Sequence, residues 1–366
     1  MQTPLRAIIA CTLLSATATA AGAQSVELTA SSWLPPTYAH STHAYTEMFE
    51  RLAERSDGEI SAEIFFGGSL LPARTTLSGI ASGAADLGYV YPAYTPAELP
   101  IQSFLNNASF VSDDMWTVAL AYTELNYTNP EAIAEWEGQG VIMPGAHATP
   151  LYHIMCNTPV TTVDEARGKR MRTAGASFSG LVDTLGGTSV SVPIGDAYSG
   201  IQRGSLDCII ADPNTLVSFS FNEVVTDVTT APLGVVTGAI WAFNADTWNG
   251  LSEEHKAMIR DEMGIAIVRT HMEFDLNAAD AFEDARSRGI ALHEPGADLS
   301  AEIDAYKARY VADLIAGAEG FDAQALYDEF AALQQAWAER LDGIDRTDEA
   351  ALVAVVREHL MDKFPF

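Results

Sequence analysis

The sequence predicts an α/β protein with two lobes, a cleft between the lobes and a long helical C-terminal region. Two observations predict this class: strand-like and helix-like stretches alternate twice along the chain, and from about Ser252 onward the pattern is almost entirely helical. Alternating strands and helices are typical of parallel sheets that helices cover. Because no sequence repeat relates the two alternating regions, we expect the same architecture twice rather than a duplicated sequence.

The first 23 residues have the pattern of a secretory signal peptide. Arg6 is their only charge, an apolar and small-residue run follows, and Ala21-Gly22-Ala23 supplies an A-x-A cleavage site. Removing these 23 of the 366 residues leaves 343, which suits two domains of ordinary size. The apolar run is too short for a membrane anchor, and no later stretch approaches the roughly 18 apolar residues of a membrane span. We therefore expect an exported, periplasmic chain that does not span a membrane.

The first alternating region covers residues 26–148. Its strand-like stretches are VELTASSW (26–33), ISAEIFF (60–66) and DLGYVY (86–91). Apolar residues at helical spacing predict one helix around residues 45–52 and a second over 72–82, which Gly83 ends. Strand, helix, strand, helix, strand predicts a parallel, doubly wound half. Two more helices should follow, one containing Trp116 and one starting at Asn129-Pro130.

A similar alternation follows. Its strand-like stretches are LYHIMC (151–156), KRMRT (169–173), SVSV (189–192) and LDCIIA (206–211), and helices are expected over 178–185 and 196–203. The stretch TGAIWAFNADTWNGLS then predicts a returning strand and a helix. No low-complexity linker separates the two regions, so we expect the chain to cross between the lobes more than once. We assign residues 26–148 and 238–277 to the first lobe, and residues 149–237 and 278–366 to the second.

Composition limits the partners and the redox state. Forty-nine acidic and 20 basic residues give a net charge of −29, which becomes −30 once Arg6 is removed. This balance argues against nucleic acid and anionic lipid surfaces as partners. After Cys11 is removed, Cys156 and Cys208 remain on strand-like segments, and the periplasm permits a disulfide between them. The alternative is that both are small, buried apolar residues.

The sequence contains none of the common catalytic signatures: H-E-x-x-H, G-x-S-x-G, a P-loop, G-x-G-x-x-G or C-x-x-C. His40 and His43 supply only two metal ligands, and the acidic pair 113–114 lies at a predicted helix start, where carboxylates favour the dipole. Ser177 and Ser179 have no histidine near them in the sequence. We therefore expect a binding protein rather than an enzyme, without cofactor or metal, whose ligand lies beyond the carboxyl ends of the strands.

The stretch GKRMRTAGASFSG (168–180) places Arg172 at the end of a short strand, directly before a helix. The first turn of a helix has free N–H groups, which we expect to point at the same place and to favour an anion there. A rigid guanidinium fork suits a carboxylate better than a lysine does. We predict that Arg172 binds an anionic ligand. The alternatives are an interlobe salt bridge of Arg172, or binding through Arg170 instead.

Five stretches, taken in order, resemble the substrate-binding proteins of TRAP transporters (tripartite ATP-independent periplasmic transporters): SSWLPPTYAHST, FFGGSLLPARTTLSGIASGAADLGYVYPAY, GKRMRTAG, LGGTSVSVPIGDAYSGIQRGSLDCIIADP and FNADTWNGLS. The resemblance runs from about Val26 to Trp337. It implies a two-lobed periplasmic binding protein fold that closes on a small organic acid and delivers it to a membrane permease of two subunits, driven by an ion gradient. The alternatives are a binding protein of an ABC importer, a sensor that presents its ligand to a membrane kinase, and an exported hydrolase.

The resemblance also implies roles for single residues. Arg172 matches the arginine with which the family grips the substrate carboxylate. The other positions expected at the ligand are Trp33, Arg74, Tyr91, Tyr152, Asp212, Trp241 and Phe243. Aromatic faces beside a carboxylate are typical of sites for onium groups, which favours a monocarboxylate with an apolar or cationic tail, such as a zwitterionic osmolyte. If Arg74 faces inward, a dicarboxylate or a sugar acid is favoured instead.

Overall fold

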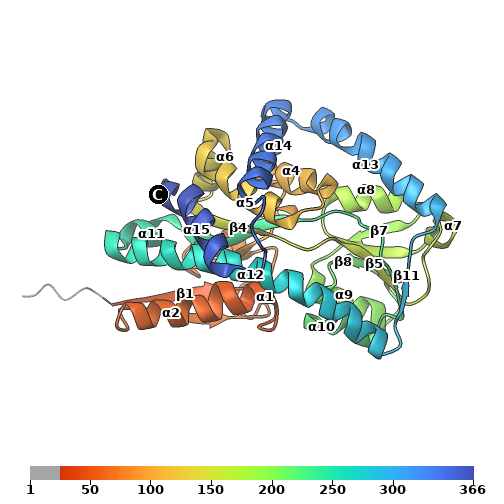
Figure 1. The fold of residues 1–366 in the computed structure, drawn as a ribbon, viewed down its shortest axis with the longest axis horizontal. Helices are drawn as coiled ribbons and strands as arrows, with labels where there is room; N and C mark the ends of the chain where they lie inside the picture. The colour runs from red at the N-terminus through yellow and green to blue at the C-terminus, as the bar shows by residue number, and fades with distance from the viewer. Residues whose placement is uncertain (1–24) are drawn as a thin grey trace, which may run out of the picture.

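The computed structural model describes residues 25–366, so the predicted signal peptide lies outside the described chain. Two separate sheets form the centres of two lobes (Figure 1). The first sheet has five strands in the order β2 (Ile60–Phe65), β1 (Val26–Ser31), β3 (Leu87–Val90), β10 (Thr237–Asn244) and β4 (Val141–Ala148). Strands β2, β1 and β3 are parallel, as predicted, whereas β10 is antiparallel to both of its neighbours. The elements around this sheet are called lobe I below.

The second sheet forms lobe II. It has six strands in the order β11 (Ala291–His293), β9 (Asp227–Thr229), β5 (His153–Cys156), β8 (Cys208–Ala211), β6 (Arg170–Thr173) and β7 (Thr188–Ser191). Strand β6 is parallel to β7 and β8, and β5 is antiparallel to β8 and β9. All four strands predicted between residues 151 and 211 are therefore present.

Helices cover both sheets. In lobe I they are α1 (Ala39–Ser41), the π-helical turn η1 (Thr42–Thr46), α2 (Glu47–Arg55), α3 (Thr76–Ala81), η2 (Pro92–Tyr94), α4 (Pro100–Ala108), η3 (Ser109–Val111), α5 (Met115–Thr128), α6 (Pro130–Gly138) and α11 (Ala245–Gly250). In lobe II they are α7 (Val163–Ala166), α8 (Ala176–Thr184), α9 (Ile194–Gln202), α10 (Asn214–Ser218) and η4 (Phe221–Glu223). The predicted start of α6 is confirmed, because the Asn129 side chain accepts hydrogen bonds from the N–H groups of Glu131 and Ala132.

The chain crosses between the sheets three times. It passes from β4 to β5, returns from β9 to β10, and crosses again in α12 (Glu253–Ser287). Helix α12 has 35 residues and so spans about 50 Å, and Figure 1 shows it running from lobe I to lobe II. It packs on β4 and α2 at one end and on α10 and β11 at the other. Within residues 25–366, no helix combines the length and the apolar character that a bilayer crossing requires.

The last helices lie differently from the expected assignment of residues 278–366 to the second lobe. Helix α13 (Ala297–Gly317) touches α8 of lobe II and α4 of lobe I. The helices α14 (Ala323–Arg340) and α15 (Glu349–His359) then pack on lobe I, where they touch α5 and α12 respectively. Trp337 is fully buried, and its neighbour Arg340 pairs with Glu124 of α5. The apolar periodicity of these helices predicts a buried face correctly, but it does not identify the surface that covers the face.

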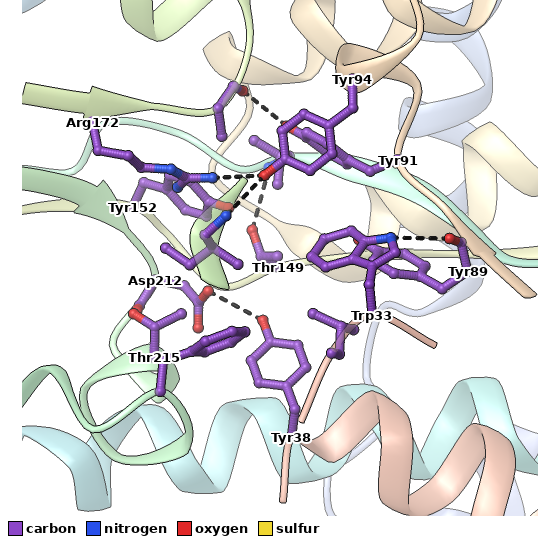
Figure 2. A pocket seen from close by; sticks show the side chains of 15 residues that line it. Trp33, Tyr38, Tyr89, Tyr91, Tyr94, Thr149, Tyr152, Arg172, Asp212 and Thr215 are labelled. Carbon is purple, nitrogen blue, oxygen red and sulfur yellow. Dashed lines mark hydrogen bonds between the residues drawn. The ribbon is translucent and has the colours of Figure 1, made fainter. Parts of the chain in front are cut away.

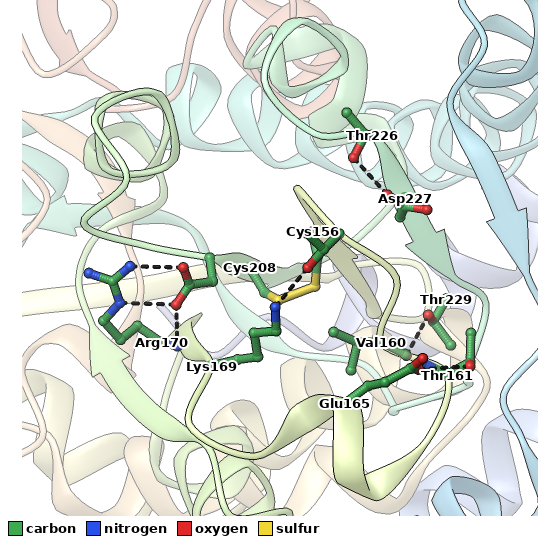
Figure 3. The surroundings of a disulfide bond; sticks show 12 residues. Cys156, Val160, Thr161, Glu165, Lys169, Arg170, Cys208, Thr226, Asp227 and Thr229 are labelled. Atoms are coloured by element: carbon green, nitrogen blue, oxygen red, sulfur yellow. Dashed lines mark hydrogen bonds and ion pairs between the residues drawn. A yellow bond between two sulfur atoms is a disulfide. The ribbon is translucent and has the colours of Figure 1, made fainter.

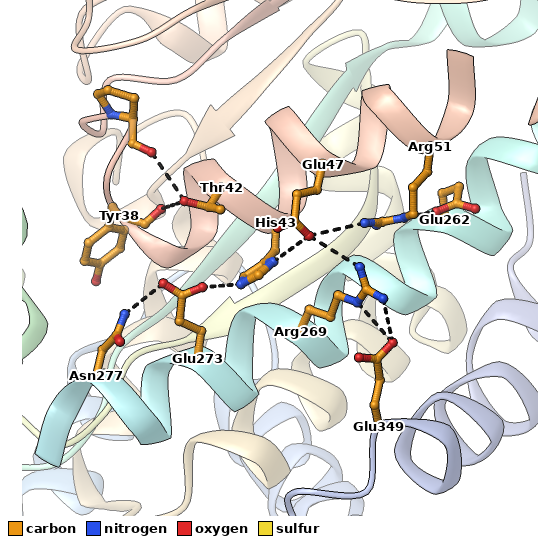
Figure 4. A network of polar contacts seen from close by, with 11 residues as sticks. Tyr38, Thr42, His43, Glu47, Arg51, Glu262, Arg269, Glu273, Asn277 and Glu349 are labelled. Atoms are coloured by element: carbon orange, nitrogen blue, oxygen red, sulfur yellow. Dashed lines mark hydrogen bonds and ion pairs between the residues drawn. The ribbon is translucent and has the colours of Figure 1, made fainter. Parts of the chain in front are cut away.

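A polar network joins α12 and α15 to η1 and α2 (Figure 4). His43, in the π-helical turn η1, contacts Glu47 at 3.0 Å and also pairs with Glu273 of α12. Arg269 of α12 bonds Glu349 of α15 at 2.9 Å. Burial lowers the pKa of His43, but its contacts with Glu273 and Glu47 outweigh burial and raise the pKa. The network therefore fixes the segment that directly follows Tyr38, a residue of the site described next.

Candidate functional site

A cavity lies between the lobes, beyond the carboxyl ends of two parallel strands in each sheet (Figure 2). Trp33 follows β1, Tyr91 follows β3, Arg172 lies near the end of β6 and Asp212 follows β8. The space between the atoms at this place is about 370 Å³, including the part that is open to solvent. Its lining is Trp33, Leu34, Tyr38, Tyr89, Tyr91, Tyr94, Thr149, Tyr152, Arg172, Ala174, Ile194, Asp212, Thr215, Phe219 and Val236.

Arg172 is the only cationic side chain among these lining residues, and it is 1% exposed. Its Nε donates to the carbonyl of Val192 at 3.0 Å, one terminal nitrogen donates to the carbonyl of Ile210 at 3.2 Å, and the other donates to the Tyr94 hydroxyl at 2.8 Å. Three of the five guanidinium N–H groups are used in these bonds within the described chain. No carboxylate in residues 25–366 forms an ion pair with Arg172. Burial lowers the pKa of its guanidinium, but the neighbouring hydroxyl groups of Tyr94, Tyr152 and Tyr91 outweigh burial and raise the pKa. One N–H on each terminal nitrogen is therefore available to an anion.

Tyr94 completes the setting of Arg172 from lobe I. It lies in η2, after the end of β3, and its hydroxyl accepts hydrogen bonds from Arg172 and from the N–H of Ile194 at 3.2 Å. Tyr94 lies in the stretch YVYPAY but is not among the residues predicted at the ligand. One feature of the sequence indicates this role. The tyrosine follows a proline that lies just beyond the end of a strand, where side chains can reach the ligand. Tyr94 therefore joins the guanidinium and the start of α9 to the opposite lobe.

Asp212 supplies the negative charge of the cavity and is also 1% exposed. One carboxylate oxygen accepts from the Tyr38 hydroxyl of lobe I at 3.2 Å, and the other accepts from the N–H of Asn214 at 3.1 Å. Burial raises the pKa of Asp212 to about 6, and the hydrogen bonds from Tyr38 and Asn214 oppose the rise. Tyr38 was a second residue that sequence reasoning passed over, although it lies in the quoted stretch SSWLPPTYAHST.

Seven of the fifteen lining residues are aromatic. Trp33 donates from Nε1 to the carbonyl of Tyr89 at 3.1 Å, and the rings of these two residues lie 4.7 Å apart. The Tyr91 hydroxyl donates to the carbonyl of Ala174 at 2.8 Å, across the lobes. Trp33, Tyr91 and Tyr152, which were predicted at the ligand, all face this cavity.

No residue of α8 lines the cavity, although we expected the helix after Arg172 to offer its free N–H groups to an anion there. The N–H of Ser177 donates to the Asn107 side chain of lobe I at 3.0 Å, so lobe I occupies this helix start. Gly175 makes the turn possible: its φ of 114° is open to glycine, and a Cβ there would lie 3.2 Å from the Asn107 side-chain oxygen. Ser179 bonds Thr173 and the carbonyl of Gly175.

Arg74 lies outside the cavity, which corrects its expected place at the ligand. Its exposed side chain belongs to an outer hollow that also includes Pro193 and Asp196. The guanidinium donates to the carbonyl of Ser191 in lobe II at 3.2 Å and to the carbonyl of Tyr94 at 3.4 Å, and it lies 5.5 Å from the centre of the Tyr94 ring. Arg74 therefore joins the two lobes on the outer side of a tyrosine that lines the cavity.

Trp241 and Phe243 do not line the cavity either, and this expectation is also corrected. Both are fully buried inside lobe I. Trp241 donates from Nε1 to the carbonyl of Ala44 at 2.9 Å, and the ring of Phe243 lies 5.2 Å from that of Trp248. Both side chains therefore pack inside lobe I and not at the cavity.

The alternative anion-binding residue, Arg170, is engaged elsewhere. It bonds the Asp207 carboxylate with Nε at 2.9 Å and with a terminal nitrogen at 2.8 Å, and it is absent from the cavity lining. Nearby, Cys156 and Cys208 are joined by a disulfide in the structure (Figure 3). They are directly opposite each other in β5 and β8, with Cα atoms 4.0 Å apart.

A family model identifies the family to which this chain belongs. The model of family 7 of the bacterial extracellular solute-binding proteins, DctP, matches residues 31–314, which is well over half of the chain. The chain belongs to this family. The match agrees with the resemblance seen in the sequence stretches, and the family is one of solute receptors rather than enzymes.

Individual relatives of this family 7 member are distant. A solute-binding protein of Albidiferax ferrireducens is 25% identical over 197 residues, which are 51% of this chain and 54% of that protein. The ectoine-binding periplasmic protein TeaA of Halomonas elongata is 25% identical over 183 residues, 49% of this chain and 52% of that protein. The chain thus spans about half the length of the curated relatives it matches. DctP7, a Bordetella pertussis extracytoplasmic solute receptor binding pyroglutamic acid, superposes with a TM-score of 0.75 at 18% identity, over 84% of this chain and 100% of that one. This likeness confirms the predicted two-lobed fold.

Proposed function

We propose that this family 7 member is the periplasmic solute-binding protein of a TRAP-type transporter, which captures a small organic acid between its lobes and delivers it to the membrane permease. One observation carries the proposal: the cavity contains a fully buried arginine that forms no ion pair with a carboxylate of the described chain. A buried charge that no ion-pair partner contacts directly is unfavourable. A ligand carboxylate removes this deficit and accepts the two N–H groups that Arg172 still offers.

The relatives support the same chemistry. Pyroglutamic acid, the ligand of the Bordetella pertussis receptor, carries a carboxylate, and so does ectoine, the ligand of TeaA. In this chain, Arg172 is contacted from lobe I by Tyr94, so a ligand carboxylate at Arg172 would stabilise the closed arrangement of the lobes. The same cavity favours a receptor over the hydrolase alternative, because Ser177 and Ser179 do not line it.

The first prediction concerns Arg172. In a thermal-shift screen of the mature chain against organic acids, a ligand present at a thousand times its Kd adds about 4 kcal/mol of stability. Arg172→Ala should weaken binding by on the order of 2–5 kcal/mol, because the ligand carboxylate loses its buried partner. Arg172→Lys should also weaken binding, because lysine lacks the planar fork.

Arg170→Ala is the matched control for this screen. It removes the same charge two residues away on the same strand, where the side chain pairs with Asp207 outside the cavity. Affinity should therefore be nearly unchanged in Arg170→Ala. Equal affinities for the wild type and Arg172→Ala, or an equal loss in both alanine variants, would contradict the proposed role of Arg172.

A further inference from the structure

We propose that the ligand is a small zwitterion, in which one carboxylate binds Arg172 and a cationic nitrogen group binds Asp212 among the aromatic rings. This inference rests on the proposed function and narrows it to one class of organic acid.

The two charges lie in one cavity but do not neutralise each other. Arg172 and Asp212 come from the neighbouring parallel strands β6 and β8, and each is 1% exposed. Among residues 25–366, no ion pair joins them, and the partners of Asp212 are the Tyr38 hydroxyl and the N–H of Asn214. Two opposite charges that are buried and unpaired at one site are unfavourable. A ligand that carries both complementary charges neutralises both at once.

The surface between the charges suits a cationic group. Burial raises the pKa of Tyr152, Asp212 raises it further and Arg172 lowers it, so Tyr152 lies near both charged groups. Tyr38 donates a hydrogen bond to Asp212 from the opposite lobe. Phe219 lies against Tyr38, with the ring centres 6.0 Å apart. Aromatic faces attract onium groups, most strongly where water is excluded. The end of the cavity near Asp212 therefore offers a carboxylate and aromatic rings to the same group.

Other classes of acid fit less well. A dicarboxylate needs a second cation, but Arg74 lies outside the cavity and donates to the carbonyl groups of Ser191 and Tyr94. A second carboxylate near Asp212 would also meet a like charge. A simple monocarboxylate would satisfy Arg172 and leave Asp212 buried without a cation. Of these classes, a zwitterion alone satisfies both charged side chains.

The test uses matched pairs of ligands that differ in one atom. Trimethylglycine and tert-butylacetate have the same shape, but nitrogen in the first is replaced by carbon in the second, which removes the positive charge. Pipecolate and cyclohexanecarboxylate form a cyclic pair, and proline and cyclopentanecarboxylate form a smaller one. Titration calorimetry of the mature chain with all six compounds gives an affinity ratio for each pair.

In the wild type, the zwitterion of at least one pair should bind at least about 30-fold more tightly than its isostere. Asp212→Asn should bring this ratio close to one. This variant keeps the shape of the side chain and an oxygen acceptor for the N–H of Asn214, so the turn after β8 should persist. Asp280→Asn is the control, because it removes the same charge at a different place. Asp280 is exposed and lines a neighbouring groove outside the cavity.

The outcomes separate this inference from the proposed function. Isosteres that bind as tightly as the zwitterions, or a panel in which no zwitterion binds, would overturn the inference. A ratio that survives in Asp212→Asn, or that falls equally in Asp280→Asn, would overturn it as well. If the isosteres bind and Arg172→Ala abolishes their binding, the proposed function stands while the inference fails. If a zwitterion binds equally well to Arg172→Ala, the proposed function fails.

Discussion

At the scale of single residues, the proposed contact between Asp212 and a cationic ligand group predicts that binding depends on pH. Its pKa of about 6 lies above the ordinary carboxyl value because burial disfavours the charged form. A raised carboxyl pKa contributes stability at low pH that is lost as the pH rises through the folded value. The empty, closed protein is therefore less stable above about pH 6 than below it. A cationic ligand group offsets this loss by stabilising the ionised carboxylate.

The affinity for a zwitterion should fall on acidification, whereas that for its isostere should not. Below about pH 6 a proton competes with the cationic group for Asp212, which lowers the affinity by up to about tenfold per pH unit. The other ionisable side chains that face Asp212 are Tyr38, Tyr152 and Arg172; burial raises the pKa of both tyrosines, so none of the three titrates between pH 5 and 8.

Calorimetry of the wild type with trimethylglycine and tert-butylacetate between pH 5 and 8 measures this difference. Asp212→Asn serves as the control and should show no such dependence. Identical pH profiles for the two ligands would show that Asp212 does not contact the distinguishing group.

At the scale of elements, the disulfide joins β5 and β8 behind the strand end that carries Asp212. Cys156 and Cys208 are 52 residues apart in sequence, and closing a loop of that length stabilises the fold by about 4 kcal/mol in the chain-entropy model. Neither cysteine lines the cavity. The cross-link should therefore contribute to stability without contributing to ligand recognition.

Replacing both Cys156 and Cys208 with alanine should lower the free energy of unfolding by up to about 4 kcal/mol and leave ligand affinity nearly unchanged. Denaturant unfolding and calorimetry of the same variant measure the two effects separately. The intact mass of the mature chain, with and without reductant, provides the control that the bond forms. A mass unchanged by reductant, or an affinity loss as large as that of Arg172→Ala, would contradict this account.

Sequence reasoning predicted the positions of elements better than the directions of side chains. Hydrophobic periodicity and strand–helix alternation predicted the parallel strands of both lobes, whereas the ligand-binding role of Arg172 stays a prediction. The structure does not place Trp241 at the cavity, because the direction of a strand residue depends on which face of the sheet is covered, and Trp241 donates to the carbonyl of Ala44 inside lobe I. Tyr38 and Tyr94 follow Pro-containing turns, where no periodicity indicates a direction.

Local sequence pattern also does not show how the lobes and the last helices pack together. Arg74 lies in a recognised motif, but only the closed arrangement of the lobes shows that it contacts Ser191 outside the cavity. Helices α14 and α15 were expected in lobe II together with the rest of residues 278–366. Their buried residues, such as Trp337, instead cover lobe I. Partner surfaces of this kind follow from tertiary packing rather than from local pattern.

At the scale of the whole molecule, side chains of both lobes meet around the cavity. Tyr38 reaches Asp212, Tyr94 receives Arg172, and Tyr91 reaches Ala174. These contacts lie at the cavity itself, whereas Arg74 joins the lobes at its outer edge. A ligand that stabilises this arrangement shifts the population toward the closed form. Contacts outside the cavity should then influence how quickly the protein opens.

Arg74→Ala should raise the dissociation rate constant of the ligand by about threefold, because it removes the exposed interlobe hydrogen bond from Arg74 to the carbonyl of Ser191. The association rate constant should change little. Stopped-flow fluorescence can follow both rates, since Trp33 lines the cavity. Arg167→Ala is the control, because Arg167 pairs with Asp164 inside lobe II and is exposed. An unchanged dissociation rate in Arg74→Ala would show that this contact does not hold the lobes together.

The central claim, that Arg172 binds a ligand carboxylate between closed lobes, is tested most directly by a crystal structure of the mature protein with the tightest-binding acid. The account predicts that both carboxylate oxygens accept hydrogen bonds from the terminal nitrogens of Arg172, at about 2.8 Å, with the remainder of the ligand directed toward Asp212 and the surrounding aromatic rings. A ligand bound in another hollow, or a carboxylate held by other residues while Arg172 keeps only its present partners, would contradict it.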